Sequence, residues 1–120
     1  MKHLSLVLYF RKVGKIMLTW YKNLYIGENA KKDHRKLIWK VNFKRKQSNV
    51  YLITIASNEK NVLDIIEARQ LEQDIVRRNC PMIIGIALGY DDALQLVQKI
   101  IEETYQKQKN TDVCGYLQTK

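Results

Sequence analysis

Two stretches in the middle of the chain carry the hydrophobic pattern of β-strands. Apolar and polar side chains alternate over residues 37–46, as in a strand with one face in the core and a basic face in water. Residues 50–56 are almost entirely apolar and rich in β-branched side chains, as in a strand covered on both faces. Because only a short polar connection separates them, the two stretches predict a β-hairpin over residues 37–56.

Further along the chain, apolar residues recur at the three- and four-residue spacing of amphipathic helices. One helix is predicted over about 61–78, with acidic residues near its start and basic residues near its end. A second is predicted over about 91–107, where Asp91 or Asp92 is suited to cap the first turn. Between the two helices, residues 82–88 form an apolar run that predicts another buried strand.

Three segments leave alternatives open. Residues 17–26 fit a strand by their aromatic content and a short helix by their spacing. Residues 113–117 predict either a short edge strand or a final helical turn. The apolar run 4–10 is followed by basic residues rather than by a cleavage site, so we expect a first strand or short helix there and no signal peptide. If Met17 is the true start, residues 1–16 are instead expected to be a loosely ordered extension.

Together these elements predict an α+β fold. We expect a two-layer α/β sandwich, in which a mixed sheet of three to five strands is covered by two long helices. The strand–helix–strand portion between residues 50 and 88 is expected to be parallel with a right-handed crossover. A length of 120 residues predicts a single domain over 1–120.

Composition adds a cellular context. No apolar run approaches the ~20 residues that span a bilayer, so no contact with a membrane is predicted. Cys80 and Cys114 lie far apart and without the spacing of a metal site. We therefore expect two reduced thiols in a cytoplasmic protein.

Positive charge is concentrated in the first third of the chain. Residues 1–46 contain 13 Lys or Arg against Glu28 and Asp33, whereas the remainder holds 8 basic and 10 acidic residues. The formal net charge of +9 therefore comes from one segment, an asymmetry typical of proteins that contact polyanions. The candidate contacts are Lys31, Lys32, Arg35, Lys36, Lys40, Lys44, Arg45 and Lys46.

Aromatic residues lie close to these basic ones in the sequence. Trp20, Tyr21 and Tyr25 precede the basic cluster, and Trp39 lies within it. Lys and Arg neutralise phosphates whatever the sequence, while exposed aromatic side chains stack on unpaired bases. We therefore expect a small basic binding module that contacts nucleic acid or another polyanion. Trp39 itself falls on the apolar side of its predicted strand and is expected in the core.

The alternative function is that of a protein-interaction module. An edge strand over 37–43 or 113–117 would pair with a partner or with a second copy to give a homodimer. The basic face would also attract an acidic protein. No enzyme is predicted, because His3 and His34 lie in basic surroundings and no spacing indicates a catalytic group, a metal site or a cofactor.

Overall fold

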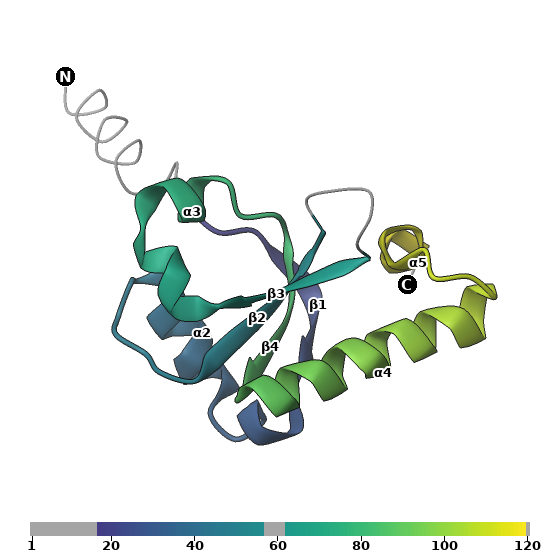
Figure 1. Cartoon of the computed structure of the whole chain (residues 1–120), viewed down its shortest axis with the longest axis horizontal. Coiled ribbons are helices and arrows are strands. Elements are labelled where there is room, and N and C mark those ends of the chain that lie inside the picture. The colour runs from purple at the N-terminus through teal and green to yellow at the C-terminus, as the bar shows by residue number, and fades with distance from the viewer. Residues whose placement is uncertain (1–16, 57–61, 120) are drawn as a thin grey trace.

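A computed structural model describes residues 17–56 and 62–119 of the chain, with its elements labelled in Figure 1. The expectations for residues 1–16 lie outside these ranges, as does the start of the helix predicted from residue 61. Within the described ranges, one sheet carries helices on both of its faces.

Four strands of the described chain form a mixed sheet in the order β1-β4-β2-β3. They are β1 (Trp20–Ile26), β2 (Val50–Ile55), β3 (Leu63–Glu67) and β4 (Ile83–Leu88). β4 pairs parallel with β1 and antiparallel with β2, and β2 pairs antiparallel with β3. β4 is buried along almost its whole length, because its apolar sequence lies between two strands and two layers of helices.

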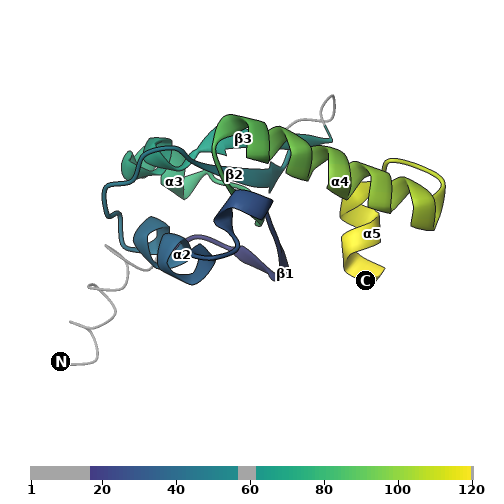
Figure 2. The same ribbon diagram turned by 90° about the horizontal axis from the view of Figure 1, so that it is seen from below.

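Helices cover both faces of the sheet. One face carries α2 (His34–Asn42), the 3-10 helix η3 (Ala68–Glu72) and α3 (Asp74–Arg78), and the other carries α4 (Tyr90–Gln108) and α5 (Val113–Thr119). Alternation along β2 builds both layers, since Leu52 packs with the α2 side and Ile53 with the α4 side. Figure 2 shows α2 and α4 on opposite sides of the sheet.

The coarse prediction is confirmed. The chain forms an α+β structure with a mixed sheet of the expected size, and the strand over 82–88 and the helix over 91–107 are both present as β4 and α4. The ambiguous segment 17–26 contains strand β1, and residues 113–117 begin helix α5.

The predicted hairpin over 37–56 is wrong, because residues 37–42 belong to helix α2 and β2 pairs with β3 instead. The alternation that indicated a strand also contains two pairs at helical spacing. In α2, Leu37 and Val41 face the core from one side of the helix, while Trp39 and Phe43 lie on its outer side. The alternation of Leu37, Trp39, Val41 and Phe43, to which Ile38 is an exception, therefore fits a strand and a helix alike.

The helix predicted over 61–78 is also wrong. Residues Leu63–Glu67 form strand β3, and the remainder forms η3 and the short helix α3. The two-layer packing with two long helices is corrected with it, since α4 is the one long helix of the described chain and both faces are covered. The expected parallel crossover between residues 50 and 88 is absent, because β2 runs antiparallel to β4.

A buried carboxylate fixes the start of α4. Gly89 precedes the helix with φ 97°, a conformation that glycine adopts without steric cost. Asp92 is 4% exposed, and its Oδ2 accepts hydrogen bonds from the backbone N–H groups of Leu88 (3.0 Å) and Asn29 (3.3 Å). Asp92 therefore joins the end of β4 to the 3-10 helix η2 (Glu28–Ala30), which follows β1. The expectation that Asp91 or Asp92 caps α4 is wrong, because Gly89 is its N-cap and no side chain in the described ranges makes a capping hydrogen bond there.

Replacing Asp92 with Ala is expected to lower the free energy of unfolding by about 1–3 kcal/mol, because two part-buried N–H groups lose their acceptor. Asp91→Ala is the matched control, since Asp91 is exposed in the same helical turn and contributes only through the helix dipole, about 0.3–1 kcal/mol. Urea denaturation followed by circular dichroism measures both. Equal effects of the two substitutions would contradict the role given to Asp92.

Candidate functional site

The outer side of α2 exposes two large aromatic side chains. Trp39 is 50% exposed and Phe43 is 59% exposed, one helical turn apart. Their ring centroids lie 5.0 Å apart with an interplanar angle of 39°. The expectation that Trp39 lies in the core is therefore wrong, and it fails because the element is a helix rather than a strand.

Basic side chains surround this aromatic pair. Arg35 and Lys36 are exposed and lie one turn before Trp39, at the spacing that places them on the same helical face. Arg45 follows the helix, and its guanidinium carbon lies 5.6 Å from the centre of the Trp39 ring, within the range of a cation–π interaction. We call Arg35, Lys36, Trp39, Phe43 and Arg45 the aromatic–basic surface.

Two of the eight predicted contact residues are engaged in exposed ion pairs. Lys31 Nζ lies 2.8 Å from Glu28 Oε1, and Lys44 Nζ pairs with Asp74 Oδ1. The hydrogen bond from Lys44, followed by its positive charge, lowers the pKa of the Asp74 carboxyl. Lys31 lowers the pKa of Glu28 in the same way. Both acids therefore stay ionised near neutral pH and offset these two lysines.

The other six predicted contacts have no acidic partner in the described part of the chain. Three of them, Arg35, Lys36 and Arg45, belong to the aromatic–basic surface. Lys32 lies in the turn before α2, Lys40 is half-buried within the helix, and Lys46 lies in the loop after it. The structure thus gathers the predicted cations around one helix. The predicted contact residues did not include Phe43, although its four-residue spacing from Trp39 indicates a shared helical face.

The end of α2 directs Arg45 back over the helix. Lys44 adopts the left-handed conformation with φ 55°, and its N–H donates to the carbonyl of Val41 at 3.4 Å. The N–H of Arg45 donates to the carbonyl of Lys40 at 2.9 Å. These two bonds define a Schellman motif, which usually has glycine at the position of Lys44. The reversal of the chain brings the Arg45 side chain to the Trp39 ring.

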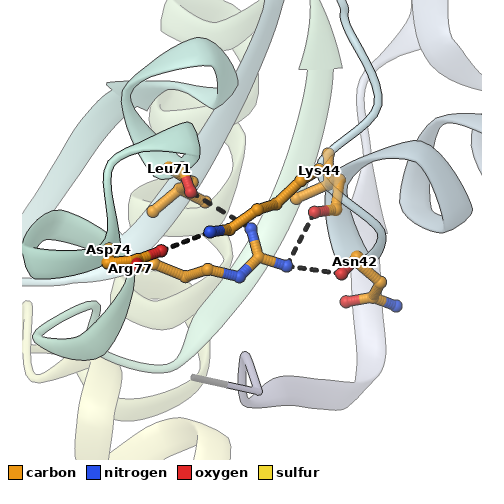
Figure 3. Close-up of polar contacts among 6 residues, drawn as sticks. Asn42, Lys44, Leu71, Asp74 and Arg77 are labelled. Atoms are coloured by element: carbon orange, nitrogen blue, oxygen red, sulfur yellow. Dashed lines mark hydrogen bonds and ion pairs between the residues drawn. The ribbon is translucent and has the colours of Figure 1, made fainter. Parts of the chain in front are cut away.

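A buried arginine holds the same end of α2 against the body of the protein (Figure 3). Arg77 of α3 is 5% exposed, and its Nη2 donates to the carbonyl oxygens of Val41 (2.9 Å) and Asn42 (2.5 Å). Its Nη1 donates to the carbonyl of Leu71 at 3.2 Å. The last carbonyls of a helix have no partner within the helix, so the guanidinium supplies one and also complements the helix dipole.

Arg77 stays charged in this position. Burial lowers the pKa of its guanidinium, while nearby Cys80 and Asp74 act in the opposite direction. Arginine keeps its proton under physiological conditions even so. A second anchor comes from β1, where the indole N–H of Trp20 donates to Asn42 Oδ1 at 2.7 Å. From the sequence, Arg77 was a basic residue near the end of the helix predicted over 61–78. In the structure it lies in α3 and donates to carbonyls at the end of another helix, α2.

A separate cavity of about 320 Å³ lies between the sheet and α3, lined mostly by apolar side chains together with Thr54, Asp64 and Cys80. Cys80 and Cys114 are both free thiols. Burial raises the pKa of the Cys80 thiol, whose Sγ donates to the carbonyl of Pro81 at 3.3 Å. A protonated, hydrogen-bonded thiol is a poor nucleophile, so this cavity offers no activated cysteine.

Comparison with protein-family models, with curated proteins and with solved structures finds no match for this chain. Across residues 17–56 and 62–119, no group of three His, Cys, Asp or Glu side chains is placed to hold a metal ion. The same residues contain no helix with the length and apolar character needed to cross a bilayer. The aromatic–basic surface of α2 is therefore the candidate functional site.

Replacing Arg77 with Met is expected to lower the free energy of unfolding by at least about 2 kcal/mol, because carbonyls of α2 and η3 lose charged hydrogen bonds. Hydrogen exchange of the α2 amides should accelerate at the same time. Arg78→Met is the matched control, since Arg78 is the exposed neighbour on the same helix and should change stability by less than about 0.5 kcal/mol. Unchanged exchange in α2 would contradict the anchoring role of Arg77.

Replacing Lys44 with Gly is expected to leave stability unchanged or to raise it by up to about 1 kcal/mol, because glycine relieves the left-handed backbone. Lys44→Ala removes the same exposed ion pair but keeps the steric cost. Thermal denaturation should therefore show the glycine variant to be more stable than the alanine variant. The reverse order would contradict the backbone conformation described for Lys44.

Proposed function

We propose that this protein binds nucleic acid through the aromatic–basic surface of α2. The observation that carries the proposal is the joint exposure of Trp39 and Phe43 among cations that have no acidic partner in the described residues. An exposed apolar patch with a charged rim is typical of an interaction surface. Basic side chains attract phosphates, and aromatic side chains contact bases.

Charge complementarity favours a polyanion as the ligand. Residues 31–46 contain eight Lys or Arg and a single acidic residue, Asp33. The nearby acids Glu28 and Asp74 are already paired with Lys31 and Lys44. A phosphate backbone laid along α2 would therefore meet mainly unneutralised positive charge, and its binding would release condensed counterions.

An acidic protein was the alternative partner. The edge strands expected over 37–43 and 113–117 fall mainly in helices α2 and α5, so pairing of a partner or a second copy with these segments loses its basis. The same cations would also attract an acidic protein. A nucleic acid also supplies bases for the exposed rings, which is why we favour it.

The test is a fluorescence anisotropy titration of labelled oligonucleotides of about 12 nucleotides, repeated over a range of salt concentrations. The double substitution Arg35→Gln and Lys36→Gln should weaken binding at least ~10-fold at about 50 mM salt and reduce the salt slope by about two. Lys99→Gln with Lys107→Gln is the matched control. It removes the same charge from exposed positions of α4, on the opposite face of the sheet, and should change affinity less than ~3-fold.

Two results would overturn the proposal. One is a lack of binding to any RNA or DNA oligonucleotide at low salt. The other is displacement of the oligonucleotide by polyglutamate at equal charge concentration, which would show that the surface recognises negative charge alone, as for an acidic protein partner.

A further inference from the structure

We infer that the aromatic–basic surface recognises unpaired bases, so that the ligand is single-stranded nucleic acid rather than a duplex. This inference rests on the proposed function and names the form of its ligand. It follows from the position of the two rings, from the groups that surround them and from what each form of nucleic acid can offer to them.

The aromatic pair lies in the middle of the surface rather than at its rim. On the outer face of α2, Arg35 and Lys36 lie one turn before Trp39, and Phe43 lies one turn after it. Arg45 approaches the Trp39 ring from the turn that follows. A ligand that contacts the cations at both ends of this face therefore has to cover the two rings.

A duplex is a poor cover for these rings. Its bases are stacked on one another and paired, so it presents phosphates and base edges outward. Trp39 has one donor, its indole N–H, and Phe43 has no donor or acceptor, so the pair offers at most one hydrogen bond to base edges. Their burial against a charged backbone would remove water from phosphates without supplying hydrogen bonds in return.

An unpaired strand fits the same surface. Its bases offer aromatic faces that stack on Trp39 and Phe43, and its phosphates reach the flanking Arg35, Lys36 and Arg45. The guanidinium of Arg45 already packs on the indole ring, and a guanidinium stacks on a base in the same way. Proteins bind single strands by this combination, in which aromatic side chains stack on the bases and cationic side chains contact the phosphates.

Other exposed aromatics lack this setting. Tyr90 and Tyr105 are 52% and 55% exposed on α4, and Tyr90 packs edge-on against Tyr51. Trp20 is only partly exposed, and its indole N–H is committed to Asn42. Among these aromatic side chains, the pair on α2 is the one in which two exposed rings contact each other at a tilt and an arginine lies over one of them.

The experiment compares one sequence in two forms, a labelled single strand of about 12 nucleotides and the same strand annealed to its complement, at one salt concentration. The wild-type protein should bind the single strand at least ~10-fold more tightly, since stacking of one base is worth about 1–3 kcal/mol. Trp39→Leu and Phe43→Leu should each weaken single-strand binding about 5- to 100-fold and change duplex binding less than ~3-fold. Leucine keeps both the helix propensity and the apolar character of the surface.

Two controls isolate the effect of stacking. Tyr105→Leu removes an exposed ring from α4 and should leave both affinities unchanged. Trp39→Phe keeps an aromatic face and should retain most of the single-strand preference, so it serves if Trp39→Leu does not fold. The tryptophan emission of the wild-type protein should be quenched by the single strand and not by the duplex, and Trp39→Phe, which leaves Trp20 as the remaining tryptophan, should lose this quenching.

The outcomes separate this inference from the proposed function. Equal affinity of the wild-type protein for the two forms, together with unaltered single-strand binding by Trp39→Leu and Phe43→Leu, would overturn the inference and leave nucleic-acid binding in place. Absence of binding to both forms at low salt would overturn the proposed function itself. Preference for the duplex would overturn the inference whatever the variants do.

Discussion

The geometry of α2 depends on the buried guanidinium of Arg77. The last carbonyl groups of α2 lie against the body of the protein and need donors that the helix itself cannot supply. Arg77 donates hydrogen bonds to two of them and to the carbonyl of Leu71 in η3. Arg77 thus holds the end of α2 against η3, while the left-handed turn at Lys44 directs the chain back toward Arg45.

The sheet explains why the other side of α2 is open to the solvent. β4 is buried between β1 and β2, and alternation along β2 sends side chains into two separate hydrophobic clusters. α2 supplies Leu37, Ile38 and Val41 to one of these clusters, while Trp39 on its far side stays half-exposed. Trp39 and Phe43 pack against each other, and Arg45 lies over the Trp39 ring, while about half of each aromatic side chain stays exposed. Their exposure is consistent with a role in binding rather than in folding.

The parts of the fold that were predictable are those with a long and unambiguous pattern. β4 is a continuous apolar run, and α4 repeats its apolar spacing over 19 residues. The hairpin over 37–56 and the helix over 61–78 were wrong because the spacing of their apolar residues fits more than one kind of element. Leu37, Trp39, Val41 and Phe43 alternate like a strand, but the same four residues form two helical pairs, and the partner strand β3 was hidden in a segment with helical spacing. Tertiary pairing decides such cases, and a single sequence does not show it.

The candidate site was predictable to a similar extent. The basic residues around α2 could be identified from charge asymmetry, and their clustering followed from their closeness in sequence. The aromatic half of the surface could not, because the assigned strand placed Trp39 in the core. Arg77 was also out of reach, since its three carbonyl partners lie in other elements and carbonyl positions leave no trace in a residue pattern.

Amide chemical shifts of the ¹⁵N-labelled protein during titration with a single-stranded oligonucleotide test the central claim most directly. If nucleic acid binds to the aromatic–basic surface, the largest shifts will fall between residues 32 and 46, and the indole N–H of Trp39 will shift with them. The amide chemical shifts of α4 and α5, on the opposite face of the sheet, will not change. Shifts centred on α4 and α5, or no shifts at saturating oligonucleotide, would contradict the account.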